Sequence, residues 1–295
     1  MIPFAERLAS GVLLGDGALG TMLFDRGLTP GQPPESVTLS NPTMLEEIAR
    51  LYLEAGADVL TTNTFGGSPL NLALHGLEAE VAAVNRTAVH ALRSVAAGRA
   101  YVAGSCGPCG RLLEPYGDTS QDAMAVSFRQ QMETLIPAGV DCVIVETMTD
   151  LAEATLAIQA AKDVSPATPV LATMTFDPTP RGYFTIMGVS VAAAAAGLAS
   201  AGADAVGSNC GNGIEHMVAI AREFRRHTQL PLVIQANAGL PRTEGVRTIY
   251  DETPAFMADH ARELLAIGVA LIGGCCGTTP NHIAALRSMI DADRR

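Results

Sequence analysis

The amino-acid sequence predicts an α/β protein that folds as a single (β/α)₈ barrel spanning residues 1–295. Three observations support this prediction. Short apolar runs alternate with amphipathic stretches of helix length along the whole chain, one helix-to-strand turn recurs four times, and no Pro/Ser-rich or low-complexity segment divides the chain in two. Such alternation is typical of parallel sheets covered by helices.

Eight apolar runs have the length of buried parallel strands. They are residues 12–15, 58–62, 101–104, 142–145, 170–173, 205–207, 232–235 and 270–273. Eight stretches of helix length alternate with them, at residues 43–55, 79–97, 121–137, 151–163, 190–201, 213–227, 254–267 and 280–291. Asn41-Pro42 before the first of these helices and Thr279-Pro280 before the last are typical helix start signals.

A weak internal repeat supports the same count. The segments EAGADVL, PAGVDCVIV, SAGADAVG and AIGVALIG each end a helix and lead directly into an apolar strand. Each contains a glycine that can adopt the left-handed conformation that closes a helix, namely Gly56, Gly139, Gly202 and Gly268. The repeat fits a closed barrel or a doubly wound sheet, and eight units without a break favour the barrel.

Composition narrows the class of partner. The formal net charge is −11 and there is no basic run, so the chain lacks the positive surface that binds nucleic acid or an anionic membrane. The N-terminus has no signal-peptide pattern. The uncharged stretch 183–203 is predicted to be a loop followed by an alanine-rich helix, not a membrane span. These features predict a cytoplasmic protein whose six cysteines are reduced.

Polar residues follow the predicted strands at one end of the barrel. In a (β/α)₈ barrel the carboxyl ends of the strands carry the active site. The residues at these ends are Asp16, Asn63, Thr64, Ser105, Cys106, Glu146, Thr147, Thr173, Asn209, Cys210, Asn237, Cys275 and Cys276. The opposite ends carry mainly helix-closing glycine and strand-opening aspartate, which indicates that the chemistry lies at the carboxyl rim.

Three cysteines on this rim, Cys210, Cys275 and Cys276, have the composition of a catalytic zinc site with an open fourth position. The alternative is a buried cysteine and an incidental vicinal pair. Vicinal residues on a regular strand point in opposite directions, but the surrounding glycines permit an irregular turn in which both face a metal. Three thiolates leave Zn²⁺ with a net charge of −1, which suits the binding and deprotonation of a substrate thiol.

Several motifs along the chain resemble those of the homocysteine S-methyltransferase family, especially the homocysteine-binding module of cobalamin-dependent methionine synthase. They are DGALGTML (16–23), NTFG (63–66), GSCGPCG (104–110), ET (146–147), GSNCG (207–211), NAGLP (237–241) and GGCCGTTP (273–280). The resemblance extends from about residue 10 to residue 290. It implies a (β/α)₈ barrel with one zinc ion bound by three cysteines.

The resemblance also implies a role for each matching residue. Cys210, Cys275 and Cys276 would be the zinc ligands, and Asn237 would occupy the fourth position before the thiol binds. Asp16 and Glu146 would hold the substrate ammonium group. The other residues assigned to substrate binding are Gly17, Ala18, Thr64 and Ser105, whose backbone would take the substrate carboxylate, and Asn209.

The expected activity is methyl transfer to a thiol amino acid, L-homocysteine, which gives methionine. The expected donor is a separate corrinoid protein that carries methylcobalamin, or a small donor such as S-methylmethionine or a betaine. A different thiol, or a corrinoid-dependent demethylation pathway, is an alternative with the same zinc site. A non-catalytic binding subunit of a corrinoid assembly is another alternative.

Two features depart from the family pattern. Cys106 and Cys109 stand at variable positions of the GSCGPCG motif, and their CGPC string also resembles a dithiol redox site. A CxxC dithiol oxidoreductase is therefore an alternative of another class. Residues 176–188 form a long predicted loop with two prolines and two aromatic residues, which suggests a lid or a binding loop.

Overall fold

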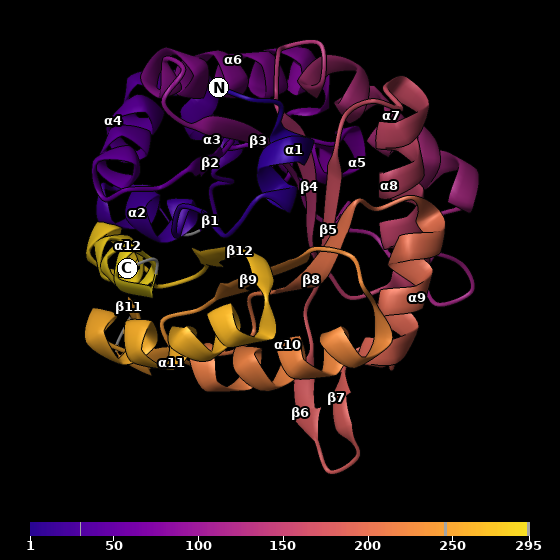
Figure 1. Cartoon of the computed structure of the whole chain (residues 1–295). Coiled ribbons are helices and arrows are strands. Elements are labelled where there is room, and N and C mark those ends of the chain that lie inside the picture. The colour runs from indigo at the N-terminus through magenta and orange to yellow at the C-terminus, as the bar shows by residue number, and fades with distance from the viewer. Residues whose placement is uncertain (30, 245–246, 294–295) are drawn as a thin grey trace.

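The computed structural model describes residues 1–29, 31–244 and 247–293. At its centre is an eight-stranded sheet of parallel strands in the order β1-β12-β9-β8-β5-β4-β3-β2 (Figure 1). The strands are β1 (Leu13–Leu14), β2 (Val59–Thr61), β3 (Tyr101–Cys106), β4 (Cys142–Met148), β5 (Val170–Met174), β8 (Ala205–Asn209), β9 (Leu232–Ala236) and β12 (Val269–Gly274). A parallel bridge between Gly15 and Val59 joins the two edge strands. The predicted (β/α)₈ barrel and its strands are confirmed.

The predicted helices surround the strands as a ring (Figure 1). They are α4 (Pro42–Glu54), α6 (Val81–Ala96), α7 (Gln121–Leu135), α8 (Leu151–Val164), α9 (Val191–Ala201), α10 (Ile214–His227), α11 (Pro254–Ile267) and α12 (Pro280–Asp293). The four glycines of the repeat all have a positive φ, as the helix-closing role requires. None of the described helices is both long and apolar enough to cross a membrane.

Several short elements were not predicted. The helical ones are α1 (Phe4–Ala9), α2 (Leu19–Asp25), α3 (Glu35–Ser40), α5 (Pro69–Leu72), η1 (Ala73–His75) and η2 (Glu78–Glu80). Two hairpins were also missed, β6 (Asp177–Thr179) with β7 (Gly182–Phe184) and β10 (Arg242–Glu244) with β11 (Arg247–Ile249). The predicted long loop at 176–188 therefore contains the first of these hairpins. Every residue of β6 is exposed, so its sequence has no apolar alternation that would indicate a strand.

The interior of the barrel is filled with side chains. Its buried cluster contains inward residues from every strand of the barrel, which are Leu13, Val59, Tyr101, Ala103, Cys142, Ile144, Leu171, Ala205, Val233 and Leu271. Phe4 and Leu8 of α1 belong to the same cluster. The Phe4 ring packs edge-on against Tyr101 at 5.3 Å, and the Tyr101 hydroxyl donates to the Ile2 carbonyl at 2.8 Å. Helix α1 thus closes the amino-terminal end of the barrel.

Three aspartates clamp neighbouring strands at the amino-terminal rim. The carboxylates of Asp58, Asp141 and Asp204 accept from backbone N–H groups of the preceding strands and pair with basic side chains of the helices. Their backbone donors are Leu14 at 2.8 Å, Val102 at 2.7 Å and Val170 at 2.7 Å. Their basic partners are Arg287 at 2.9 Å, Arg93 at 2.8 Å and Lys162 at 2.7 Å. Each aspartate stands two residues after the glycine of a repeat segment.

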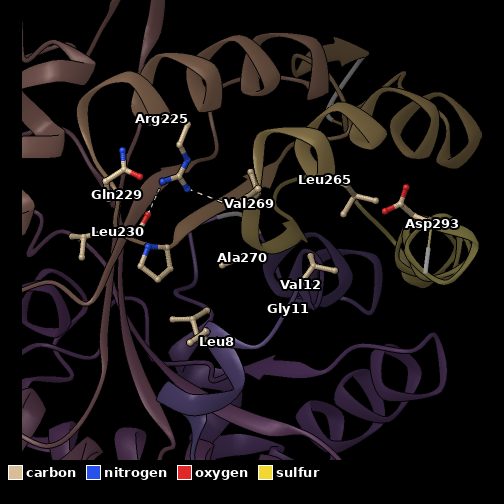
Figure 2. A pocket seen from close by; sticks show the side chains of 13 residues that line it. Leu8, Gly11, Val12, Arg225, Gln229, Leu230, Leu265, Val269, Ala270 and Asp293 are labelled. Atoms are coloured by element: carbon tan, nitrogen blue, oxygen red, sulfur yellow. Dashed lines mark hydrogen bonds between the residues drawn. The ribbon is translucent and has the colours of Figure 1, made fainter. Parts of the chain in front are cut away.

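The fourth repeat segment has Ala270 at the equivalent position. A pocket of about 420 Å³ lies there, lined by Ala270, Arg225 and Leu230 among others (Figure 2). Within the described part of the chain, the Arg225 guanidinium donates only to backbone carbonyls, those of Thr228, Leu230 and Gly268, at 3.1 to 3.4 Å. No carboxylate of the described residues pairs with it.

Candidate metal centre

Strand periodicity brings the candidate residues to one rim. Side chains at alternate strand positions point to the same side, so the inward set of the core continues toward the carboxyl ends. In β3, β4 and β8 this set continues from the apolar core to Ser105, Glu146 and Asn209. The described structure therefore places these three side chains above the filled interior, where they hydrogen-bond to one another across strands.

The three predicted metal ligands converge. The sulfur atoms of Cys210, Cys275 and Cys276 all lie within 4.8 Å of one another, and those of Cys210 and Cys276 are 3.7 Å apart. Tetrahedral zinc with Zn–S bonds of about 2.3 Å requires sulfur atoms about 3.8 Å apart. The sulfur cluster thus has the size that one zinc ion requires.

Backbone geometry explains how vicinal cysteines face the same point. Strand β12 ends at Gly274, so Cys275 and Cys276 lie in the turn that follows it. The Cys275 N–H donates to the Ala236 carbonyl at 2.7 Å, and the Ala238 N–H donates to the Cys276 carbonyl at 3.0 Å. The end of β9 therefore holds both cysteine backbones.

Cys210 reaches the same point through an uncommon backbone conformation. Its φ is +60°, a left-handed value that is unfavourable for a residue with a side chain. Thr147, at a register irregularity near the end of β4, has the same φ. Strained residues of this kind persist where the surrounding structure holds them, often at functional sites.

The sulfur atoms influence one another's protonation. Hydrogen bonding with Cys210 lowers the pKa of Cys276, while hydrogen bonding with Cys210 raises the pKa of Cys275. One thiolate is therefore stabilised at the expense of its neighbours, since like charges at this distance repel. All three sulfur atoms can ionise together only against a bound cation, which is the donor chemistry of a thiolate metal site.

Tyr250 is a site residue that the sequence did not indicate. Its phenol lowers the pKa of the Cys276 thiol, and burial raises the pKa of the phenol itself. Its ring packs directly against Gly277, where a Cβ atom would collide with it. Tyr250 follows the β10–β11 hairpin, so no motif around the cysteines could have indicated it.

Asn237 lies in the loop after β9, beside the cysteines. Its side chain is buried, and its Oδ1 atom has no hydrogen-bond partner among the described residues. A buried oxygen without a partner is costly, so such an atom is expected to bind a group that is not part of the chain. A free acceptor at this position fits a fourth metal ligand.

Two buried carboxylates share the rim. Asp16 accepts from the N–H and the hydroxyl of Thr61 at 2.7 and 2.8 Å, and burial raises its pKa to about 6. Glu146 accepts from the Ser105 hydroxyl at 2.5 Å and from the Asn209 amide at 3.1 Å, and burial raises its pKa to about 7. No ion pair among the described residues includes either carboxylate. Both carboxylates are therefore suited to bind an external cation.

The predicted carboxylate-binding backbone lies at the same rim. Three of its N–H groups have partners within the chain: Ala18 donates to Thr278 Oγ1 at 3.1 Å, Thr64 to the Thr62 carbonyl at 2.9 Å and Ser105 to Thr62 Oγ1 at 3.0 Å. Gly17 packs so closely against Thr278 and Tyr52 that a side chain at this position would collide with both.

The remaining rim cysteines are protected thiols. The side chains of Cys106 and Cys109 are buried, and burial raises the pKa of Cys106 well above its usual value and that of Cys109 to about 12. The Cys106 thiol donates to Gln131 Oε1 at 3.3 Å. A dithiol redox site needs a thiol with a lowered pKa, so this environment is unsuited to the oxidoreductase alternative.

Comparison with known proteins agrees with this geometry. Residues 13–290 match the model of the family described as homocysteine S-methyltransferase. Methionine synthase of Mycobacterium leprae is 32% identical over 97% of this chain, and methionine synthase of Mycobacterium tuberculosis is 30% identical over 96%. The chain spans about a quarter of the length of these two relatives, 25% in each case.

A solved structure shares the whole architecture. The metallated form of the homocysteine methyltransferase MmuM from Escherichia coli superimposes with a TM-score of 0.80 at 28% identity. The match covers 97% of this chain and 99% of that protein. A methyltransferase from Methanosarcina mazei, 10% identical with a TM-score of 0.63, shares the fold.

Proposed function

The chain belongs to the homocysteine S-methyltransferase family, and we propose that residues 1–295 form a zinc-dependent domain that methylates L-homocysteine to methionine. The observation that carries the proposal is the placement of three converging sulfur atoms beside two buried carboxylates that have no basic partner among the described residues. A thiol amino acid requires a soft metal for its sulfur and anions for its ammonium group, and this rim offers three sulfur ligands for such a metal together with two carboxylates.

Each group of residues has a distinct task. Cys210, Cys275 and Cys276 would hold zinc, and three thiolate ligands would make this an electron-rich site in which a substrate thiol would be bound as a nucleophilic thiolate. Asn237, whose oxygen has no partner in the part of the chain that the structure describes, would yield its position to that thiol. Asp16 and Glu146 would bind the ammonium group. The backbone near Gly17, Ala18, Thr64 and Ser105 would receive the carboxylate, which requires the N–H groups of Ala18, Thr64 and Ser105 to exchange their present partners for it.

The proposed methyl donor is methylcobalamin carried by a separate corrinoid protein. The likeness to two methionine synthases supports this choice. A small methyl donor is the alternative, and a different thiol with the same zinc site is a second one. Turnover assays that combine each donor with homocysteine and with other thiols distinguish these cases.

The decisive experiment is the metal content of anaerobically purified protein. We expect one zinc per chain in the wild type and its loss in Cys210→Ala, Cys275→Ala and Cys276→Ala. The matched control is Cys106→Ala, which removes another buried thiol of the same rim and is expected to retain zinc. Reduced wild-type protein that binds no zinc would contradict the proposal, as would zinc that survives all three ligand substitutions.

A further inference from the structure

Asn209 forms the densest hydrogen-bond network of the site. Its Oδ1 atom accepts from the Thr147 N–H and from the Thr173 hydroxyl, each at 2.7 Å. Its Nδ2 atom donates to Thr147 Oγ1 at 2.8 Å and to Glu146 Oε2 at 3.1 Å. A side-chain amide has two acceptor and two donor sites, so all four are engaged within the protein.

The orientation of this amide is determined by its neighbours. The backbone N–H of Thr147 can only donate, so the oxygen of Asn209 must face it. The nitrogen consequently faces Glu146, and it also lies 3.9 Å from the sulfur of Cys275. The left-handed backbone of Thr147 presents its N–H to Asn209. The strain at residue 147 thus contributes to a fixed amide orientation.

Asn209 therefore connects two parts of the site that bind different ends of the substrate. On one side is Glu146, the proposed ammonium ligand, and on the other is Cys275, a proposed metal ligand. The amide is buried and its bonding capacity is filled, so it has no free atom for the substrate. We propose that Asn209 is a positioning residue that holds the Glu146 carboxylate in register with the metal-bound sulfur, and that it does not bind the substrate directly.

This inference rests on the proposed function and is tested with two thiols. L-homocysteine carries the ammonium group, and 4-sulfanylbutanoate is the same molecule without it. Both are titrated into cobalt(II)-substituted protein, in which the thiolate-to-cobalt absorption reports sulfur binding without turnover. The ratio of the two affinities measures how much the ammonium pocket contributes.

We expect the wild type to bind homocysteine more tightly than 4-sulfanylbutanoate. In Asn209→Ala the ratio of the two affinities should fall about tenfold, because the hydrogen bond to the charged Glu146 carboxylate is removed. The affinity for 4-sulfanylbutanoate should change by less than about threefold. Asn85→Ala is the matched control, since Asn85 is an equally buried asparagine that bonds only to the Gly67 and Val81 carbonyls. It should keep the wild-type preference.

A second variant serves if Asn209→Ala does not fold. Thr173→Val keeps the side-chain shape and removes one of the two donors that hold the Asn209 oxygen. It should weaken the preference in the same direction and by less. An unchanged preference for homocysteine in both variants would overturn the positioning role. An equal loss of affinity for both thiols in Asn209→Ala would overturn it as well. A wild type that binds neither thiol would instead overturn the proposed function.

Discussion

Glu146 determines the pH dependence expected of this site. Burial raises its pKa from 4.5 to about 7, so the folded protein retains a proton that the unfolded chain has already released at neutral pH. Because the pKa is higher in the folded state, protonation of Glu146 stabilises the fold fully below about pH 4.5. This contribution to the free energy of unfolding disappears as the pH rises to about 7. Ammonium binding has the opposite trend, because it requires the ionised carboxylate.

The preference for L-homocysteine over 4-sulfanylbutanoate should therefore increase about tenfold from pH 6 to pH 8, since a group with a pKa near 7 is about one-tenth ionised at pH 6. Comparing the two thiols cancels the proton released by the sulfur itself. Titrations of cobalt(II)-substituted protein across this range measure the ratio. In Glu146→Gln the ratio should be small and should change only about twofold over this range, through Asp16, whose pKa is about 6. A slope in that variant equal to the wild-type slope would assign the titration to another group.

Tyr250 should control how tightly the metal is held. Its phenol lowers the pKa of the Cys276 thiol, and a neighbour that stabilises a thiolate reduces the charge that the sulfur must share with the metal. Polar neighbours of a metal ligand commonly change metal affinity by about tenfold or more. Tyr250→Phe should therefore keep one zinc per chain but change its transfer rate to a chelator about tenfold. Tyr116→Phe, at a tyrosine that is 76% exposed, is the control. Equal transfer rates in all three proteins would exclude this role.

At the scale of elements, the sequence was most informative where burial is continuous. The strands Cys142–Met148 and Val170–Met174 are buried almost throughout, so their apolar runs stand out from the flanking helices. The helix-closing glycines marked where the following strands begin. The residues at the strand ends could be assigned to one rim because all parallel strands of a barrel point the same way.

The missed elements are short or depend on distant partners. The hairpin of β10 and β11 has three residues in each strand, too few for a periodic pattern. Tyr250 follows this hairpin, so its contact with Cys276 arises only from the folded path of the chain. Cys210, Cys275 and Cys276 could be found from sequence because thiolate ligands are restricted to one residue type. The bonding role of Asn209 could not, because asparagine has many roles in loops.

Helix α1 should stabilise the barrel without affecting its chemistry. Phe4 is buried among the inward residues of the strands at the end opposite the cysteines. Phe4→Ala should lower the free energy of unfolding by about 3 kcal/mol, because it removes aromatic packing and leaves a cavity. Urea denaturation measures this loss, and zinc content should stay at one per chain. Ile2→Ala, at a residue that is 49% exposed, should have little effect. A large loss of zinc in Phe4→Ala would show that the two ends of the barrel are coupled.

For the whole molecule, the two rims have separate tasks. The carboxyl rim gathers thiols, buried carboxylates and strained backbone, all of which are costly for the folded state. The amino-terminal rim contains ordinary stabilising contacts, with a repeated aspartate that ties a strand to its neighbour and to a helix. This division matches the general rule for barrel enzymes, in which the amino-terminal face supports stability.

The fourth repeat lacks this clamp, so supplying it should stabilise the protein. Ala270→Asp would place a carboxylate in the pocket that Arg225 lines (Figure 2). In the repeat segments this position is the one that Asp58, Asp141 and Asp204 occupy. The Arg225 guanidinium is partly buried, and this burial lowers its pKa, so a facing carboxylate should be favourable. The expected gain in the free energy of unfolding is about 1 kcal/mol, measured by urea denaturation at low salt. The gain should disappear when the same change is made in Arg225→Gln protein. A gain of equal size in both backgrounds would show that filling the pocket, and not the ion pair, stabilises the fold.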